Sequence, residues 1–436
     1  MQKIVSLAKR RGFIFPSSEI YGGVEALWDY GPLGSLMKNN IKNEWLETFV
    51  QQRDDVVLID ATVLMHPKVW EASGHLKNFT DPLVECKKCH SRFRPDLLKE
   101  KKCPNCGNKE FTEAKQFNLM FKTFLGAAED SAGVAYLRPE TAQSMFTNFN
   151  LVQESMRLKI PFGIAQIGRS FRNEITTGNF TFRSREFDIA EIEYFVKPGE
   201  DEKIFEKWLI EWEEFFLDLG LEKENLRRYE HKKEALAHYS KRTVDIEYKF
   251  PWGWAELAGV ANRTDFDLNQ HARFSGQKLD YFDEETGKRY VPYVIEPTLG
   301  IERLLLALLV DAYNEVKGGR SLTTQAIKEV ETVLRLNKKI APVKVAIFPL
   351  VKNKPPLVKK AREIESLLKP YFVCQYDESD SIGRRYRRQD EIGTPFAITV
   401  DFETLEKDDI TLRDRDTMKQ ERIKINQLIP CLKNLL

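Results

Sequence analysis

The sequence lacks any hydrophobic run long enough to cross a membrane. Its longest apolar stretch spans residues 304–310, whereas a transmembrane helix needs about 20 consecutive apolar residues. The first 13 residues carry basic side chains but no continuous apolar segment of the kind found in secretory signals. We therefore expect a soluble, cytoplasmic protein with no membrane partner.

A strong excess of charge of either sign is also absent. The 67 basic residues face 66 acidic ones, which leaves a net charge of +1. A nucleic-acid partner would then have to meet a local basic surface, because the whole molecule offers no attraction. No internal repeat or low-complexity tract is visible. A chain of 436 residues exceeds what one hydrophobic core usually organises, so we expect two domains.

Cysteine is scarce, and four of the 6 cysteines form two closely spaced pairs, Cys86 with Cys89 and Cys103 with Cys106. This spacing is typical of a tetrahedral thiolate zinc site, whereas a reducing cytoplasm disfavours disulfides. Four thiolates leave no open coordination position, so the zinc is expected to be structural. His90 is an alternative ligand, although a surface histidine beside the metal loop is the simpler interpretation.

An apolar stripe with helical spacing follows Gly31-Pro32. It consists of Met37, Ile41, Trp45 and Phe49. A β-branched segment comes next at 56–63, and Pro67 predicts that this strand ends there or lies at a sheet edge. The helix either packs on its own sheet or forms a dimer seam, and periodicity leaves both open.

Two later segments, 160–174 and 187–196, predict an antiparallel hairpin. Side chains alternate between the faces of a strand, so Arg172 and Glu174 share one face of the first strand. The same rule places Glu191 beside Phe187 in the second. Because an unpaired buried charge is costly, this face predicts a polar cleft over the sheet.

The hairpin carries a candidate nucleotide site. Arg172 and Glu174 alone would usually form a solvated ion pair, but the loop adds Arg183 and Arg185, and Arg303 opens a leucine-rich helix downstream. Guanidiniums hold phosphate oxygens through charge-assisted bonds, and a carboxylate can accept a hydrogen bond from the adenine amino group. The lack of an obvious nucleophile fits such a site, because phosphoryl and nucleotidyl transfer depend on positioning and charge stabilisation.

Between these landmarks, charged and aromatic residues at helical spacing predict a helical insertion outside the main sheet at about 200–242. Further strands are predicted at 243–248, 255–260 and 290–297. The helix from residue 304 is apolar on most sides, so it should be central. A polar stretch from Gly318 to Lys339 predicts a connection between domains.

The remaining sequence alternates strands and helices, with strands predicted at 343–348, 371–376 and 396–400 and a helix at 357–368. It contains an arginine cluster around one tyrosine: Arg384, Arg385, Arg387 and Arg388. Composition alone favours a solvated helix face. An RNA contact that combines phosphate neutralisation with base stacking is the alternative.

Longer sequence motifs surround these residues, and they indicate a known family. They are Trp28-Asp29-Tyr30-Gly31-Pro32, Trp70-Glu71-Ala72-Ser73-Gly74-His75, Arg138-Pro139-Glu140-Thr141-Ala142-Gln143, Phe171-Arg172-Asn173-Glu174, Phe182-Arg183-Ser184-Arg185-Glu186-Phe187, Glu296-Pro297-Thr298 and Gly300-Ile301-Glu302-Arg303. The segments around Arg172, Arg183 and Arg303 resemble motifs 2 and 3 of class II aminoacyl-tRNA synthetases, and the helix and strand before Pro67 resemble motif 1. The other motifs resemble the homodimeric glycyl-tRNA synthetases over nearly the whole chain.

The resemblance implies an α+β protein. Residues 1–335 would form a class II catalytic domain, an antiparallel β-sheet flanked by helices, with a zinc insertion at 84–115 and the helical insertion at about 200–242. Residues 340–436 would form a C-terminal α/β anticodon-binding domain, which favours the RNA interpretation of the arginine cluster. The implied activity is glycine–tRNA ligase: a homodimer activates glycine with ATP and Mg²⁺ to glycyl-adenylate and transfers it to the 3′ end of tRNA(Gly).

The resemblance also implies site residues. Arg172 would contact the α-phosphate, Glu174 would bind adenine, and Arg303 would hold the γ-phosphate; these three form the catalytic set. The full ATP set is Arg172, Asn173, Glu174, Phe182, Arg183, Ser184, Arg185, Glu186, Phe187, Glu256, Leu257, Gly300, Ile301, Glu302 and Arg303. The glycine set is Arg94, Glu140, Phe187, Asp188, Ile189, Ala190, Glu191, Glu296, Pro297, Thr298, Leu299 and Gly300. Thr298 stands where the family has serine.

Two other functions are compatible with the same sequence motifs. Synthetase-like folds also serve as inactive accessory subunits, but such relatives should have lost the arginines that grip ATP. A class II synthetase for another amino acid would share the motifs and differ only in the substrate pocket.

Overall fold

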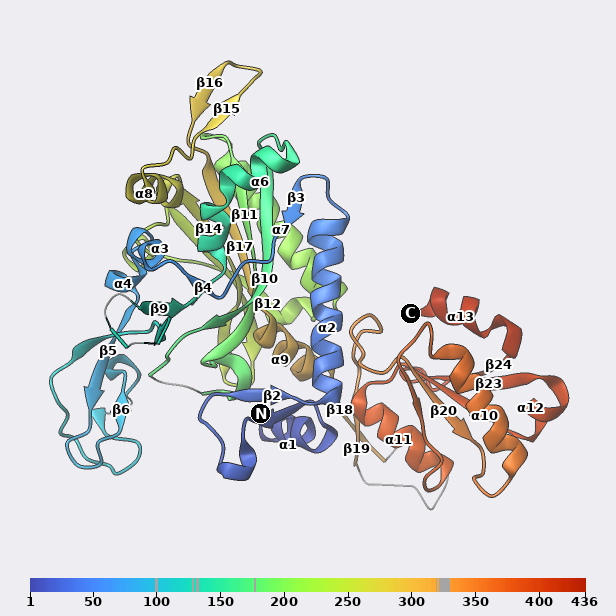
Figure 1. The fold of residues 1–436 in the computed structure, drawn as a ribbon. Helices are drawn as coiled ribbons and strands as arrows, with labels where there is room; N and C mark the ends of the chain where they lie inside the picture. Colours follow the sequence, from blue (N-terminus) through green and yellow to red (C-terminus); the bar gives the residue numbers. More distant parts are fainter. Residues whose placement is uncertain (99–100, 128, 131–132, 176–177, 319, 321–329) are drawn as a thin grey trace.

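The protein is described here from a computed structural model, which defines residues 1–98, 101–127, 129–130, 133–175, 178–318, 320 and 330–436. A large N-terminal body is built on a seven-stranded sheet, and a smaller C-terminal body on a five-stranded sheet stands beside it (Figure 1). Within these residues, every helix is too short or too polar to cross a bilayer.

The large sheet contains the predicted hairpin. Its strands lie in the order β12 (Leu226–Glu230), β13 (Arg242–Phe250), β14 (Gly253–Thr264), β17 (Tyr293–Gly300), β11 (Glu186–Val196), β10 (Phe162–Phe171) and β3 (Val56–Leu58). Neighbours are antiparallel except β3, which pairs in parallel with β10 at the sheet edge. β3 ends at Leu58, before the predicted residue 63, and Pro67 opens helix α3 (Pro67–Ala72). β10 ends at Phe171, before the predicted residue 174, because the N–H of Arg172 donates to the carbonyl of Arg185 and closes the loop.

Three helices cover one face of this sheet: α2 (Pro32–Leu46), α7 (Asp201–Asp218) and α9 (Ile301–Ala312) (Figure 1). The predicted stripe of α2 and the π-helical turn that extends it (Glu47–Gln51) is buried, and Trp45 at its centre is 0% exposed. α2 therefore packs on its own sheet. The leucines of α9 are buried on nearly all sides, which confirms a central helix.

The opposite face of the sheet is covered only at one end. Helices α5 (Ala142–Thr147), α6 (Phe149–Met156) and α8 (Phe266–Ser275) pack there around Phe146, Phe162 and Phe195. The rest of this face carries polar side chains from β11, β14 and β17. The sheet therefore has an apolar back under helices and a polar front.

Helix α7 lies in the segment where helices are predicted, at about 200–242. It buries Trp208 and Trp212 in the main core, however, so it packs against the main sheet and is not separate from it. Residues 226–230 form the edge strand β12, whose side chains are mostly exposed. An edge strand that is exposed to solvent on both faces needs no alternation of apolar and polar residues, so the sequence has no pattern there that predicts a strand.

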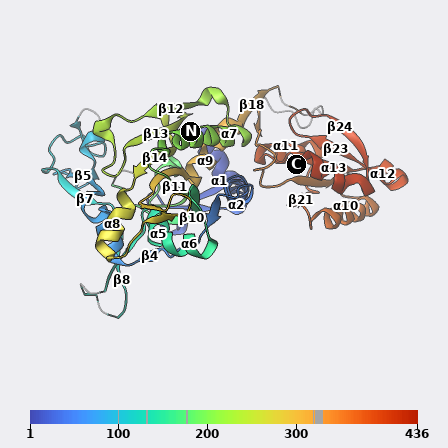
Figure 2. The same ribbon diagram turned by 90° about the horizontal axis from the view of Figure 1, so that it is seen from above.

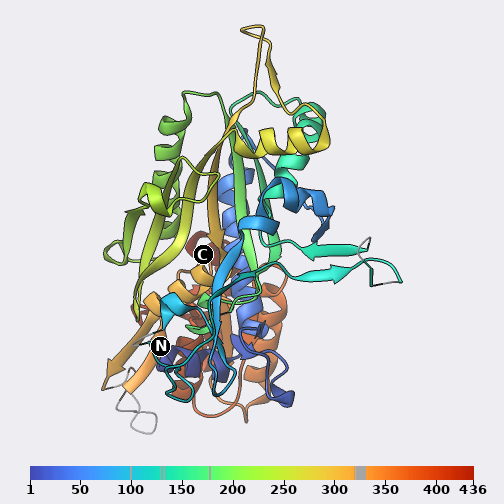
Figure 3. The same cartoon turned by 90° about the vertical axis from the view of Figure 1, so that its left-hand side faces the viewer.

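Smaller sheets project from the body. β5 (Thr80–Glu85), β6 (Arg92–Phe93) and β7 (Lys115–Asn118) form one, and β4 (Leu64–Met65), β8 (Lys122–Phe124) and β9 (Val134–Leu137) form another. Figure 3 shows the β8–β9 hairpin in teal extending sideways and the yellow hairpin of β15 (Tyr281–Asp283) and β16 (Lys288–Tyr290) above the body.

The C-terminal body confirms the predicted α/β order. Its strands lie in the order β21 (Cys374–Tyr376), β20 (Val345–Pro349), β22 (Phe396–Val400), β23 (Asp409–Asp414) and β24 (Gln420–Lys424), with the first three parallel. Helices α10 (Pro355–Leu368), α11 (Ile382–Ile392), α12 (Phe402–Lys407) and α13 (Leu428–Leu435) accompany them (Figure 2).

The two bodies are joined by a ribbon of β18 (Tyr313–Lys317) and β19 (Val330–Leu334). Much of the predicted connection, residues 319 and 321–329, lies outside the described residues. β19 contacts α11, and the guanidinium of Arg11 in α1 (Gln2–Arg11) donates from Nε to the carboxylate of Glu391 at 2.7 Å. Contacts of this kind attach the C-terminal body to the N-terminal one.

Candidate active site

A hollow of about 590 Å³ lies over the polar front of β11 and β17. It is lined by the guanidiniums of three arginines, two glutamates, three hydroxyl side chains and two phenylalanine rings: Arg172, Arg183, Arg303, Glu174, Glu256, Thr181, Ser184, Thr298, Phe182 and Phe187, together with Ile189, Gly300 and Glu302.

Arg172 is held at one side of this hollow. Its Nε donates to the carbonyl of Pro139 at 3.1 Å. Its guanidinium carbon lies 5.3 Å from the ring centre of Phe187 and 5.6 Å from that of Phe79. A cation is attracted to the face of an aromatic ring at this distance, so the rings restrict where the guanidinium can move.

Arg303 is held at another side. Its Nη1 lies 2.9 Å from Oε2 of Glu256, and its guanidinium carbon lies 4.6 Å from the ring centre of Phe182. The charge of Arg303 lowers the pKa of Glu256. Arg172 and Arg303, which are far apart in the sequence, therefore face one space that also contains an ionised carboxylate.

A second hollow of about 840 Å³ adjoins the first, because Arg172, Glu256 and Thr298 line both. Its distinguishing feature is a group of buried carboxylates from three separate elements, Glu140, Glu191 and Glu296. The two hollows therefore lie side by side along the front of the sheet, with these three residues between them.

The three glutamates are fixed by different partners. Glu191 accepts hydrogen bonds from the backbone N–H of Thr141 at 2.6 Å and of Ala142 at 3.0 Å. Glu140 accepts from Nε2 of Gln143 at 2.9 Å and lies 3.3 Å from Nε2 of His75. Glu296 accepts from Nη1 of Arg263 at 2.8 Å. Every carboxylate is thus oriented before any ligand binds.

Burial and mutual repulsion set the protonation of this group. Burial raises the pKa of Glu296 to about 8, despite the opposing charge of Arg263. Burial and then the charge of Glu140 raise the pKa of Glu191. Burial opposes ionisation of Glu140 as well, but the charge and hydrogen bond of His75, together with Arg263 and Gln143, outweigh it and lower the pKa of Glu140. A cation placed among these carboxylates would relieve their repulsion, which suits a ligand ammonium group.

Strand alternation places part of the predicted set on the back of the sheet. The side chains of Ala190, Leu257, Leu299 and Ile301 lie in the apolar core, and Asp188 pairs with Lys38 of α2 at 3.0 Å. Pro297 lies between Glu296 and Thr298 in β17, so strand alternation turns it to the back of the sheet as well. None of these residues is among those that line either hollow.

Other predicted residues support the loop or lie to one side. Arg185 donates from Nη1 to the carbonyl of Glu25 at 2.9 Å, and the N–H of Asn173 donates to the carbonyl of Leu119 at 2.8 Å. Glu186 pairs with Arg169. Arg94 pairs with Asp81 at 2.7 Å and Asp96 at 2.8 Å in the small β5–β7 sheet, apart from both hollows.

His231 and Asp245 also line the second hollow, although neither was among the predicted site residues. Nε2 of His231 lies 2.8 Å from Oδ2 of Asp245. Burial, followed by the charge of Glu256, raises the pKa of Asp245 to about 6. Alternation in β13 was the available signal: Val244 and Ile246 are apolar, so Asp245 between them must face the polar front.

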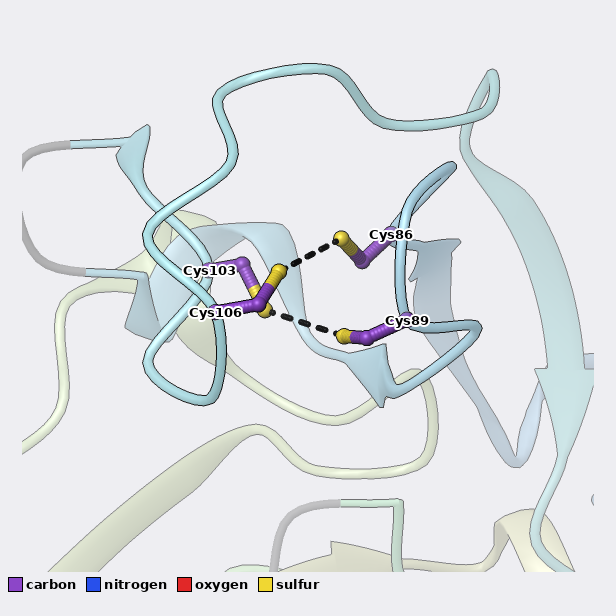
Figure 4. A group of neighbouring side chains, drawn as sticks. All are labelled: Cys86, Cys89, Cys103 and Cys106. Atoms are coloured by element: carbon purple, nitrogen blue, oxygen red, sulfur yellow. Dashed lines mark hydrogen bonds between the residues drawn. The ribbon is translucent and has the colours of Figure 1, made fainter.

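The four predicted metal ligands come together beside β5 and β6. Their sulfur atoms all lie within 4.8 Å of one another, with Cys86 3.6 Å from Cys106 and Cys89 3.5 Å from Cys103 (Figure 4). A tetrahedral site with metal–sulfur bonds of about 2.3 Å requires sulfurs about 3.8 Å apart. The cluster therefore fits a metal ion. His90 points instead to Glu85, with Nδ1 3.0 Å from Oε1.

The arginine cluster of α11 divides between interior and surface. Arg385 is 2% exposed, and its guanidinium donates to the carbonyls of Pro349, Ser379, Glu378 and Asp380.

The other arginines of α11 are progressively more exposed. The side chain of Arg387 is 10% exposed and pairs with Glu331 of β19. Arg388 pairs with Asp377 and Asp380 at 28% exposure, and Arg384 is 55% exposed. Only Arg384 and Arg388 offer appreciable surface.

Family models match both bodies. Residues 127–312 match the tRNA synthetase class II core domain (G, H, P, S and T), and residues 344–435 match the anticodon binding domain. A solved prolyl-tRNA synthetase from Cryptosporidium parvum superimposes with a TM-score of 0.66 at 15% identity, covering 99% of this chain and 76% of that one. This likeness shows the fold alone. Fold and site together define a class II synthetase core with an anticodon-binding domain.

Curated relatives narrow the class. A glycine–tRNA ligase from Streptomyces coelicolor is 55% identical over 98% of this chain and 96% of its own length. Those from Caldanaerobacter subterraneus (53%, covering 98% and 96%) and Alkaliphilus oremlandii (52%, covering 100% and 98%) are similarly close. The chain belongs to the glycine–tRNA ligase family.

Proposed function

We propose that this protein activates glycine with ATP and transfers it to tRNA(Gly). The observation that carries the proposal is that a hollow framed by arginines adjoins one framed by carboxylates, and that Arg172 lines both. A triphosphate and an amino acid held in these two hollows would meet at that guanidinium.

In the first step, the carboxylate of glycine attacks the α-phosphorus of ATP, and pyrophosphate leaves with the electron pair of the broken bond. Arg172 lies at the junction of the hollows, so it would stabilise the charge that develops on the α-phosphate oxygens. Phe187 would stack on adenine, Glu174 would accept from the adenine amino group, and Arg303 would hold the γ-phosphate. Positioning and electrostatics supply the rate, because no side-chain nucleophile is required.

In the second step, a ribose hydroxyl at the 3′ end of tRNA attacks the carbonyl carbon of glycyl-adenylate, and AMP leaves. The carboxylates Glu140, Glu191 and Glu296 would hold the glycine ammonium throughout. Selection of glycine must come from steric exclusion, since it has no side chain to bind. Thr298 borders both hollows and adds a methyl group to that wall.

The proposal includes two metal ions, Mg²⁺ and Zn²⁺. Mg²⁺ bound to the phosphates would neutralise charge on them, and the Glu256 carboxylate, which pairs with Arg303, would supply an oxygen ligand. The four-cysteine cluster would hold a structural Zn²⁺, because its four sulfurs lie within 4.8 Å of one another and thiolates are soft ligands. Elemental analysis should give one zinc per chain, and a protein purified without chelators that contains no zinc would exclude this part of the proposal.

The setting of the reaction completes the proposal. Arg384 and Arg388 would contact tRNA phosphates beside the anticodon, and the protein would act as a cytoplasmic homodimer. Light scattering should report twice the mass of the chain, 50.8 kDa. A stable and active monomer would contradict the dimer.

Amino-acid-dependent pyrophosphate exchange tests the activity. ATP should exchange labelled pyrophosphate with glycine and at least about 100-fold less with alanine, serine or threonine, since a chamber built around a hydrogen atom excludes larger side chains. Exchange driven by serine, alanine or threonine would assign a different synthetase. Exchange with none of the four, together with intact ATP binding, would favour an accessory subunit.

A further inference from the structure

Beside the nucleotide hollow, which Glu302 also lines, lies a cluster of two carboxylates and two lysines. Lys42 pairs with Asp188 alone, whereas Lys38 pairs with both carboxylates. Nζ of Lys38 in α2 lies 2.5 Å from Oε1 of Glu302 and 3.0 Å from Oδ2 of Asp188. The three residues are 6%, 4% and 3% exposed, respectively. Charges this deeply buried are costly unless they are paired, so the cluster differs from a solvated surface network.

The two carboxylate residues are also joined through the backbone. The N–H of Asp188 donates to Oε1 and Oε2 of Glu302 at 3.0 and 2.9 Å. This bond ties the first turn of α9 to the beginning of β11. Arg169 adds a further contact, because its Nε donates to Oδ1 of Asp188 at 2.8 Å. Motif elements that are distant in sequence are thereby fixed to one another, and α2, which runs beside α9, supplies the shared cation (Figure 1).

Each carboxylate residue is adjacent in sequence to a side chain that lines the nucleotide hollow. Asp188 follows Phe187, and strand alternation places the Phe187 ring on the front while the Asp188 carboxylate is anchored at the back. Glu302 precedes Arg303, so anchoring Glu302 fixes the helical turn from which Arg303 extends. Displacement of either anchor would move a side chain that faces the nucleotide.

We propose that Lys38 is a positioning residue for ATP: it holds Asp188 and Glu302 together and thereby fixes Phe187 and Arg303, although Lys38 itself does not line the nucleotide hollow. The inference rests on the proposed function only for the identity of the nucleotide. It also accounts for Asp188 in the predicted glycine set, since its side chain acts from the back of the sheet.

The charges of the cluster support a bridging role for Lys38, because it pairs with both carboxylates whereas Lys42 pairs with Asp188 alone. Burial raises the pKa of Glu302 despite the nearby charge of Lys38. Burial opposes ionisation of Asp188 too, but Lys38 and Lys42 outweigh it and lower the pKa of Asp188. Without Lys38, two adjacent buried carboxyl groups would compete for a single remaining lysine, and repulsion would favour their separation.

Lys38→Met tests the proposal, because it removes the ammonium group and keeps most of the side-chain length. Binding of adenylyl imidodiphosphate with Mg²⁺ is measured by calorimetry on the full chain, and the KM values for ATP and glycine are measured separately by pyrophosphate exchange. We expect nucleotide affinity to fall about 10- to 100-fold, as for a misplacement of about 1 Å. The KM for glycine should stay within about twofold, because the carboxylate chamber has other anchors.

Arg53→Met is the matched control. Arg53 is 14% exposed in its side chain and pairs with Asp55 at 2.8 Å and Glu211 at 2.6 Å, and it lines neither hollow. Arg53→Met should lower the thermal midpoint by about as much as Lys38→Met does and leave nucleotide affinity unchanged. If Lys38→Met also lowers only the thermal midpoint, Lys38 is merely structural and the proposal is overturned.

Asp188→Asn provides a second variant if Lys38→Met does not fold, since it keeps the shape and the backbone donor. We expect about tenfold weaker nucleotide binding; unchanged binding overturns the proposal. Failure of the proposed function has a different signature: wild-type protein that binds the nucleotide but shows no glycine-dependent exchange would reject glycine activation and leave the positioning result standing.

Discussion

The front hairpin and helix α11 are both rich in arginine, yet the structure treats their arginines differently. In the hairpin, Arg172 faces a cleft and makes a single backbone contact through Nε within the described residues. In α11, the guanidinium of Arg385 is enclosed by backbone carbonyls. A guanidinium has five donors, so its role depends on whether the protein has already satisfied them. Arginine in the sequence therefore predicts a contact only where the fold leaves donors for a ligand.

The largest effect expected from this comparison is at Arg172. Arg172→Ala should lower kcat/KM for glycine-dependent pyrophosphate exchange. The loss corresponds to about 3 to 4 kcal/mol of transition-state stabilisation, because the substitution removes a preorganised donor to the charge that develops on the α-phosphate. Thermal unfolding should be nearly unchanged and serves as the control. Unaltered exchange would show that this arginine does not belong to the reacting centre.

Substitution of Arg385 should have the opposite pattern. Arg385→Met leaves the buried carbonyls of Pro349, Glu378 and Asp380 without their donor, which should destabilise the C-terminal body by about 2 to 3 kcal/mol. Chemical denaturation measures the loss. Exchange in the absence of tRNA should persist, and loss of exchange without loss of stability would break the comparison.

Arg263 extends the comparison to an arginine satisfied by carboxylates. It pairs with Glu296, whose pKa is raised to about 8, first by burial. Raising the pH through 8 ionises Glu296 and completes the ammonium site, so the KM for glycine should fall about tenfold between about pH 6.5 and 8.5. Glu296→Gln should bind glycine weakly at every pH. If the KM for glycine depends on pH just as strongly in Glu296→Gln, another group is responsible for the titration.

The smallest effect is expected at the surface of α11. Arg384→Gln should weaken tRNA binding about fivefold and reduce its salt dependence by about one counterion, because an exposed arginine contributes mainly by neutralising one phosphate. Filter binding at several salt concentrations measures both. Arg362→Gln, with 53% side-chain exposure on α10, is the matched control. Equal losses in the two variants would place the RNA elsewhere.

Much of this organisation was predictable from the sequence because its signals are local. The four-residue stripe of α2, the alternation in β10 and β11 and the paired cysteines all correspond to what the structure shows. The shared cleft of Arg172 and Arg303 followed from motifs, since no local pattern relates residues so far apart.

The remainder depends on tertiary context. β12 is exposed on both faces and therefore has no strand pattern. The burial of Arg385 depends on carbonyls from other segments. Asp188 and Leu299 lie beside site residues in the sequence, but alternation turns their side chains to the back of the sheet. Contiguous motifs thus overstate the number of side chains that can reach a ligand.

The central claim is that one cleft holds the nucleotide and the amino acid side by side, joined at Arg172. Calorimetry with a non-hydrolysable mimic of glycyl-adenylate tests it most directly. One mimic should bind per chain at least about 100-fold tighter than ATP or glycine, because it occupies both halves at once, and it should displace both. A mimic that binds no tighter than ATP, or leaves glycine bound, would show that the two hollows are separate sites.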